Sequence, residues 1–277
     1  NAAGIVGCRI IDSPRERLIA MITNNFVPCN GRFPTLIAII SMFFVGVSGG
    51  AFDSMLSALL LTLFIVLGVC MTFLVSKALS MTVLKGIPSS FTLELPPYRR
   101  PQIGKVIVRS IFDRTLFVLG RAIAVAAPAG LLIWVMANVQ VNGITLLAHC
   151  SGFLDPFARL LGMDGVILMA FILGLPANEI VIPIIIMSYM ANGTMLDIQN
   201  LTFIKELFIN NGWTITTALC TIVFIIFHFP CATTLQTIYK ETLSWKWTCF
   251  AFILPTLIGI FLCTTIHGIS ILLSIMI

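Results

Sequence analysis

The sequence predicts an all-α protein, a polytopic bundle of transmembrane helices in which some helices are broken or re-entrant. Hydrophobic residues make up 58% of the 277 residues and charged residues only 10%, whereas soluble domains carry roughly a quarter charged residues. The mean hydropathy is +1.06. The apolar stretches are also long and continuous rather than alternating, which favours membrane helices over the strands of a membrane barrel.

Six stretches are apolar and long enough to be membrane spans. Two further segments, 143–163 and 231–247, are shorter and interrupted by glycine or proline, which predicts re-entrant or interfacial segments. The six expected spans lie at residues 34–50, 54–76, 116–137, 165–191, 213–229 and 248–277.

Basic residues set the expected orientation. The longest polar connection, 77–114, holds seven Lys and Arg residues and is predicted to be cytoplasmic, because basic loops stay on that side of the membrane. Two spans separate it from the amino-terminal segment, which carries Arg9, Arg15, Arg17 and Arg32 and belongs on the same side. Segment 139–164 holds a single basic residue and is expected outside. No basic stripe with interleaved aromatic residues is present, so the net charge of +5 gives no reason to expect a nucleic acid partner.

A later segment weakly repeats the amino-terminal one. An odd number of expected spans separates the two segments, as in transporters built from inverted repeats. The matches are few enough to arise by chance. They appear when Asn1 is set against Ala232, which pairs Arg9 with Lys240, Ser13 with Ser244 and Arg15 with Lys246.

The fourth expected span is interrupted near its middle. Pro176 and Pro183 both lack the N–H group that a helix interior needs. Glu179 is the one charged residue of the stretch 165–191, and an ionised carboxylate there costs about 2.5–3.5 kcal/mol on insertion scales. A cation pathway would offset this cost, because freed carbonyls, the Asn178 amide and the Glu179 carboxylate together offer oxygen ligands.

Arg121 lies inside or at the edge of the third expected span. It is either an anchor that reaches to the membrane surface or the partner of an intramembrane acid. In the second case Glu179 would pair with Arg121 and hold two helices together without binding a cation. The sequence does not separate these two interpretations.

Two Pro-Cys pairs mark further candidates. Pro230 pre-sets a helix start and places Cys231 near exposed amides, which favours the thiolate. A thiolate beside a broken helix suits a borderline-soft divalent metal such as Fe²⁺, although such a pair alone is more often structural. His228 is expected to be a packed or interfacial imidazole. Cys29 ranks last among the ligand candidates, because the nearby Arg32 would repel a cation, and a structural or gating role suits it better.

Several familiar catalytic motifs are missing from the sequence. It contains no phosphate-binding GxxxxGK[ST] loop, no HExxH and no dinucleotide fingerprint. The eight cysteines show no CxxC spacing and resemble small buried hydrophobes. The pattern therefore favours a transporter over an enzyme.

Five runs in order resemble the ferrous iron transport protein B (FeoB) family. The resemblance implies Fe²⁺ uptake across the bacterial inner membrane by a helical domain with two Gate segments of inverted topology, each marked by a cysteine. Cys231 matches the second Gate cysteine. The first Gate reads Gly-Cys-Asn in the family, and this chain begins at Asn1, so it looks cut or truncated. The runs are DSPRERL (12–18), NNFVPCNGRFP (24–34), ELPPYRRP (94–101), GLPANEIVIP (174–183) and PCATT through WKW (230–247).

The resemblance also implies partners and a division of the chain. Family members carry a GTP-binding domain on the same polypeptide, so GTP would act only through a domain absent from this chain. The bilayer, small accessory transport proteins and further copies of the chain are the other implied partners. We expect three parts: 1–33, the remainder of the first Gate segment with an interfacial helix; 34–138, a first helical half with the basic loop 77–114; and 139–277, a second half containing the broken helix 165–191 and the second Gate segment 213–247.

The expected function is therefore the permease portion of an Fe²⁺ uptake transporter. The predicted metal ligands are Cys231, Glu179 and Asn178, with Cys29 ranked below them. Pro176, Pro183, Pro230 and Arg121 are expected to have gating or structural roles. Two alternatives stay open: a transporter of nucleosides or other small solutes, because Gate segments also resemble parts of nucleoside transporters, and a non-transporting scaffold for a separate GTPase.

Overall fold

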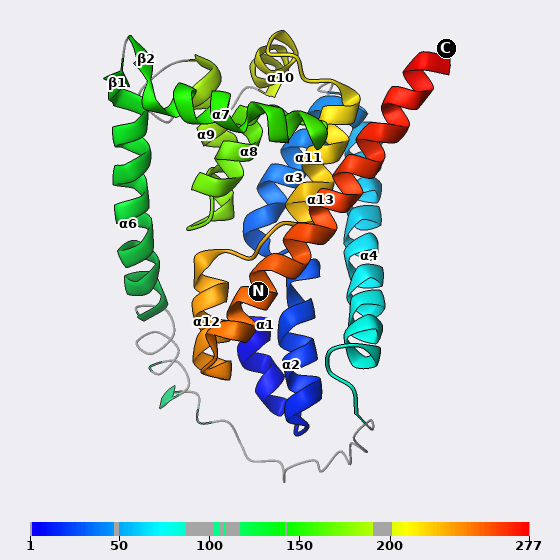
Figure 1. Ribbon diagram of the computed structural model, residues 1–277, viewed down its shortest axis with the longest axis vertical. Coiled ribbons are helices and arrows are strands. Elements are labelled where there is room, and N and C mark those ends of the chain that lie inside the picture. The colour runs from blue at the N-terminus through cyan, green and yellow to red at the C-terminus, as the bar shows by residue number, and fades with distance from the viewer. Residues whose placement is uncertain are drawn as a thin grey trace.

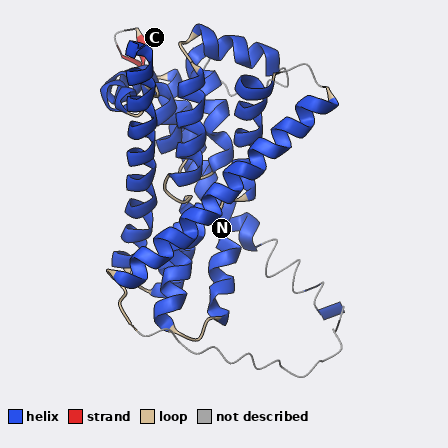
Figure 2. Ribbon diagram, turned by 90° about the vertical axis from the view of Figure 1, so that its right-hand side faces the viewer, coloured by secondary structure: helices blue, strands red, loops and turns tan. Residues whose placement is uncertain are grey.

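A computed structural model describes residues 2–46, 50–86, 102, 104–105, 108, 117–141, 143–190 and 201–276. Within these residues the only strands are β1 (Gln140–Val141) and β2 (Ile144–Thr145), which form a small antiparallel hairpin. All other regular secondary structure in the described residues is helical (Figures 1 and 2). The all-α prediction is confirmed.

The helices vary widely in length, from single turns to more than thirty residues. The short elements marked η are 3-10 helices, except η4, which is a π-helix. In chain order the helical elements are α1 (Ala2–Gly7), η1 (Cys8–Ile10), α2 (Pro14–Thr23), η2 (Asn24–Phe26), η3 (Asn30–Arg32), α3 (Phe33–Ile40), η4 (Ser41–Val45), α4 (Ala51–Met81), α6 (Phe117–Asn138), α7 (Leu146–Leu160), α8 (Gly165–Leu173), η6 (Asn178–Ile180), α9 (Val181–Met190), α10 (Leu201–Asn210), α11 (Ile215–Phe227), α12 (Ala232–Thr242) and α13 (Trp245–Met276).

Four helical stretches of the described chain are long and apolar enough to cross a membrane. They are Pro14–Val45, Phe52–Met81, Ile215–Thr242 and Trp245–Ile275. The pair α7 and α8, which meet at 108°, is either a fifth, broken span or a re-entrant loop, and it includes most of the segment 143–163 that we predicted to be re-entrant or interfacial.

The expected spans are corrected in two places. The stretch 165–191 is not one span, because it divides into α8 and α9, of 9 and 10 residues. The stretch 34–50 is part of a longer broken run that begins at Pro14. By length and composition, the described residues hold four such stretches, or five if the bent pair is one span. The expected span 116–137 coincides with α6, many of whose side chains lie outside the described residues, so the count of six stays a prediction.

The two ends of the bundle carry the segments that the charge pattern assigned to them. In Figure 1 the turn between α1 and α2 lies at the same end as the residues that follow α4, whereas the β-hairpin and α7 lie at the opposite end. Arg15 Nη1 donates to the carbonyl oxygens of Leu84 and Gly86, at 3.0 and 2.9 Å. The amino-terminal segment thus contacts the start of the basic loop 77–114, most of which lies outside the described residues.

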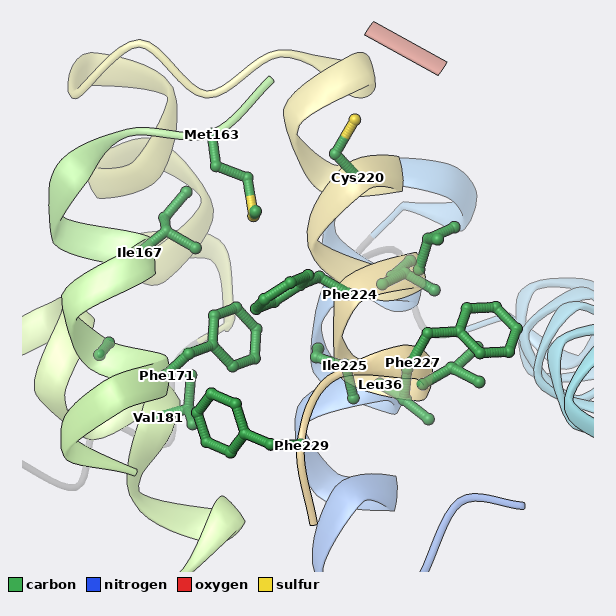
Figure 3. Packing of buried hydrophobic residues seen from close by; sticks show 14 of the residues in the cluster. Leu36, Met163, Ile167, Phe171, Val181, Cys220, Phe224, Ile225, Phe227 and Phe229 are labelled. Carbon is green, nitrogen blue, oxygen red and sulfur yellow. The ribbon is translucent and has the colours of Figure 1, made fainter. Parts of the chain in front are cut away.

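The core surrounds α11. Nine residues of this helix are buried, and it packs against α13 on one side and α3 on another. Phe224 of α11 meets Phe171 of α8 edge to face, with ring centroids 4.9 Å apart (Figure 3). In contrast, Phe73 of α4 and Phe261 of α13 are each 70% exposed, as expected of side chains that face lipid. The carboxyl end of α11 therefore lies deep inside the bundle.

The weak sequence repeat coincides with two similar helix pairs. Ser13 immediately precedes α2 and Ser244 immediately precedes α13, so the matched serines mark corresponding helix starts. Helix α1 packs against α12, and Arg9 forms an ion pair of 2.7 Å with Glu241. In Figure 1 both pairs descend to a turn and then rise again. The inverted relation expected of the two segments stays a prediction.

Candidate functional site

Three interruptions of the helices meet inside the bundle. The first lies between α2 and α3, the second between α8 and α9, and the third between α11 and α12. The backbone N–H of Ala232 donates to the carbonyl oxygen of Leu175 at 2.8 Å, which joins the second break to the third. Asn25 Nδ2 donates to the carbonyl oxygen of His228 at 2.9 Å, which joins the first to the third. Segments far apart in the sequence therefore form one polar centre.

Two of the three predicted proline breaks are confirmed. Helix α8 ends three residues before Pro176, and α11 ends three residues before Pro230. Pro183 was wrongly expected to interrupt a helix. It lies in the first turn of α9, where backbone N–H groups need no partner within the helix, so proline is tolerated there.

Arg32 lies between the first and third breaks, and its side chain is buried, since only 1% of the residue is exposed. Its guanidinium nitrogens donate to oxygens from both the first and the third break. Nη1 lies 3.1 Å from Asn25 O and 3.0 Å from Ile226 O, and Nη2 lies 3.2 Å from Asn25 Oδ1, 3.4 Å from His228 O and 3.3 Å from Phe229 O.

The position of Arg32 corrects its assignment to the cytoplasmic basic residues. Helix α11 ends at Phe227, and the last carbonyls of any helix lack partners within the helix. A guanidinium offers several donors in a fixed fork and can satisfy a group of such carbonyls. Arg32 therefore closes the buried end of α11, and sequence reasoning missed this function.

The two candidate cysteines lie near this guanidinium. The Arg32 backbone N–H donates to the carbonyl oxygen of Cys29 at 2.9 Å, and Arg32 Nη2 donates to the carbonyl oxygen of Phe229, two residues before Cys231. Cys231 directly precedes α12 with an extended backbone, as the helix-start prediction requires. Its sulfur lies 3.2 Å from Thr234 Oγ1. The fold thus brings the two Pro-Cys pairs to a single place.

Asn178 enters the same centre from the second break. It is 8% exposed, and its Oδ1 lies 3.4 Å from His228 Nε2. His228 is 1% exposed, and its Nδ1 lies 2.8 Å from Ile225 O and 3.0 Å from Phe224 O. The packed imidazole that we expected is confirmed. Both ring nitrogens therefore face oxygen acceptors, and a neutral imidazole can donate its single N–H to only one side.

Glu179 reaches across from η6 to η3. A Cβ atom built on Gly31 would lie 3.1 Å from Glu179 Oε1, so the carboxylate rests against the backbone next to Arg32. Glu179 is nevertheless an exposed residue, and the centre does not bury it. Arg121 belongs to α6, at the edge of the bundle in Figure 1. Its side chain lies outside the described part of the structure, so the pairing of Arg121 with Glu179 stays untested.

These neighbours do not form a closed metal site. Among the described residues, no three His, Cys, Asp or Glu side chains are placed to hold a metal ion together. Cys29, Cys231 and Glu179 are therefore not close enough together in this conformation to share one ion. Their roles therefore stay predictions, and coordination by them would require a rearrangement of the centre.

Two family models match adjacent parts of the chain. One, described as "Ferrous iron transport protein B C terminus", matches residues 61–113, and the other, the Gate model described as "Nucleoside recognition", matches residues 119–245. A curated relative from Staphylococcus aureus (strain MSSA476), named Fe(2+) transporter FeoB, is 29% identical over 266 residues, which cover 92% of this chain. Over nearly its whole length the chain is similar to proteins of the ferrous iron transport protein B family. The Gate match includes the second and third breaks but not the first.

FeoB relatives from other organisms match the same extent of the chain. The Fe(2+) transporter FeoB of Methanocaldococcus jannaschii is 24% identical over 265 residues, covering 91% of this chain and 37% of the relative. That of Leptospira interrogans (strain Fiocruz L1-130) is 22% identical over 281 residues, covering 92% of this chain and 39% of the relative. The chain thus spans a little over a third of the length of these relatives, and 37% of the S. aureus protein. No solved structure matches.

Proposed function

We propose that this chain is the membrane permease portion of an Fe²⁺ uptake transporter, and that the ion crosses at the meeting point of the three breaks. The observation that supports the proposal is that the breaks carrying the predicted ligands are joined: Asn178 lies against His228, Glu179 against Gly31, and Ala232, next to Cys231, is bonded to Leu175. An unwound backbone deep in a helical membrane protein is tolerated where it is buried in protein or lines a cavity. Transporters use such breaks to bind ions.

The chemistry of the centre suits ferrous iron. Thiolates from Cys29 and Cys231 are soft ligands, and the Glu179 carboxylate and Asn178 amide are harder ones. Fe²⁺ is borderline in softness and accepts both kinds, whereas Mg²⁺ and Ca²⁺ prefer oxygen alone. Glu179 is exposed, so its carboxylate is placed to meet the ion first and to follow it toward the cysteines.

The proposal extends to the location of the transporter and to its partners. We place it in the bacterial cytoplasmic membrane, as a transporter and not an enzyme. A GTP-binding domain would belong to the additional length that the relatives have, and would control the permease through the basic end of the bundle. Small accessory proteins and further copies of the chain are proposed partners, because the resemblance implies them.

Fe²⁺ uptake by the full-length transporter tests this proposal. The test variants are Cys231→Ser and Glu179→Gln, and their matched controls are Cys249→Ser and Glu206→Gln, which change exposed residues of the same types. We expect uptake to fall at least tenfold in both test variants and to be unchanged in both controls. Wild-type uptake in Cys231→Ser and Glu179→Gln would remove the proposed ligands.

A nucleoside transporter is the second candidate, because the Gate match carries the description "Nucleoside recognition". Nucleoside binding by the purified protein, without Fe²⁺ binding, would favour it. A non-transporting scaffold is a third, favoured by the open ligand arrangement among the described residues. Failure of the reconstituted full-length protein to pass any metal or solute would favour the scaffold.

A further inference from the structure

Arg32 places a fixed positive charge inside a cluster of oxygen atoms at the end of α11. We propose that Arg32 is a tethered cation that closes the pathway: its guanidinium occupies the oxygen-lined space that a passing metal ion must enter, and it must leave before the ion can cross. This inference rests on the proposed pathway through the three breaks. Arg32 would thus determine which cations pass and when they pass.

The oxygen atoms around Arg32 have the chemistry of a cation site. Three are backbone carbonyls near the carboxyl end of α11, from Ile226, His228 and Phe229, and two belong to Asn25. The carboxyl end of a helix carries a partial negative charge. Unwound carbonyls and helix ends of this kind coordinate ions in transporters with broken helices. In this conformation the guanidinium takes the place of such an ion.

Arg32 is held incompletely, as a movable residue requires. Two of its five contacts, to His228 O and Phe229 O, measure 3.4 and 3.3 Å, longer than well-formed N–H···O bonds. Among the residues that the structure describes, Arg32 Nε finds no hydrogen-bond partner and is buried. An unsatisfied buried donor is costly. A conformation in which Arg32 Nε finds a partner would therefore recover part of the free energy that is lost when the other hydrogen bonds of Arg32 break.

The positions of the cysteines make Arg32 and a metal ion exclude each other. Arg32 is bonded through its backbone N–H to the carbonyl oxygen of Cys29 and through Nη2 to the carbonyl oxygen of Phe229, two residues before Cys231. A divalent ion bound by the sulfurs of Cys29 and Cys231 would meet a like charge that the protein interior screens poorly. Metal binding at the cysteines and Arg32 in its oxygen cage are therefore alternative states. Arrival of Fe²⁺ would drive Arg32 out, and its return would close the pathway behind the ion.

A purely structural arginine would give different results from a tethered cation. If Arg32 only closes the end of α11, its loss weakens the fold and creates no new permeability. If it blocks the pathway, a neutral replacement opens a leak for small cations, and a basic replacement keeps the pathway closed. Guanidinium ion added from outside would fit the vacated cage and restore the block.

The experiment measures cation leak through the full-length transporter in proteoliposomes without nucleotide. The variants are Arg32→Ala, Arg32→Gln and Arg32→Lys, with Lys240→Ala as an exposed basic control. Probe ions are Tl⁺ and Mn²⁺, and melting temperatures report folding. We expect at least a tenfold larger leak in the Ala and Gln variants, reduced by millimolar guanidinium chloride. We expect no increase in the Lys variant or the control.

Each outcome decides the inference. A folded Arg32→Gln protein that stays tight, or one whose leak guanidinium leaves unchanged, would overturn the tethered cation. If Arg32→Ala does not fold, the comparison of Gln with Lys decides alone. If the wild-type protein carries Fe²⁺ but Arg32→Gln does not leak, this inference fails and the proposed function stands. If the wild-type protein carries no Fe²⁺, the proposed function fails, and the Tl⁺ leak still reports on Arg32.

Discussion

Replacing Gly31 with alanine is a sharp test of the role of Glu179, because it alters the position of the carboxylate without removing it. The added Cβ would lie 3.1 Å from Glu179 Oε1, 3.3 Å from Cγ and 3.7 Å from Cδ. Ordinary carbon contacts begin near 3.5 Å, so the side chain must move by a few tenths of an ångström. Glu179 is exposed and can rotate away. The free energy of unfolding should therefore change by less than about 1 kcal/mol.

Uptake should respond more strongly than stability to this substitution. A ligand held away from its place by one methyl group can no longer meet an ion held by Cys29 and Cys231, and small misplacements have large effects on rates. We expect Fe²⁺ uptake by the full-length transporter to fall severalfold in Gly31→Ala, with little change in melting temperature. Gly7→Ala is the control, because a Cβ there meets no described atom within 4 Å. Wild-type uptake in Gly31→Ala would refute the assignment of Glu179, and a large loss of stability would refute the geometry.

Two further substitutions test the packing that positions the breaks. Gly68→Ala would place a Cβ 2.5 Å from the backbone oxygen of Phe26, so α4 must shift away from η2. We expect the free energy of unfolding, measured by thermal unfolding, to fall by about 1–3 kcal/mol. Unchanged stability would contradict this close approach. Tyr189→Phe removes the hydroxyl that donates to Asp164 and accepts from Trp213 Nε1 at 2.8 Å. We expect the free energy of unfolding to fall by about 1–3 kcal/mol and the tryptophan fluorescence to shift. A wild-type spectrum and melting temperature would argue against these hydrogen bonds.

The sequence was sufficient to predict the helical class and two of the breaks. Pro176 and Pro230 lie in or after long apolar runs, and a missing N–H in a helix interior ends or kinks the helix. The same reasoning failed at Pro183, because the chain restarts its helix at Val181 and proline is harmless in a first turn. Local composition marks a break, but it does not tell where the next helix begins.

The centre itself was not predictable from local sequence. In the sequence Arg32 is one more basic residue beside a span. Its structural role depends on its hydrogen bond to the carbonyl oxygen of Ile226, which lies 194 positions away along the chain. Nothing in the local sequence shows that this guanidinium closes the end of α11. A signal did exist, since Arg32 directly precedes an apolar helix within the candidate span Pro14–Val45, and a charge inside a span is a functional hypothesis by default.

The predicted ligand set stays a prediction. Cys231 and Asn178 belong to two breaks that we predicted, and Asn178 lies against His228 of the third break. Cys29 was ranked last because Arg32 would repel a cation, yet Arg32 is bonded both to the carbonyl oxygen of Cys29 and to that of Phe229, two residues before Cys231. Arg32 does repel a cation, and we propose that Arg32 and the metal ion therefore occupy this centre in alternative states. The division of the chain at 33/34 and 138/139 stays a prediction.

The most direct test of the central claim is metal binding at the cysteines. Co²⁺ reports thiolate coordination through a charge-transfer band in the near ultraviolet, and it can be titrated into the purified full-length transporter in place of Fe²⁺. The account predicts a thiolate band in the wild-type protein and in Cys249→Ser, and its loss in Cys231→Ser. A band of equal intensity in Cys231→Ser, or none in the wild-type protein, would contradict the claim that the ion crosses where the three breaks meet.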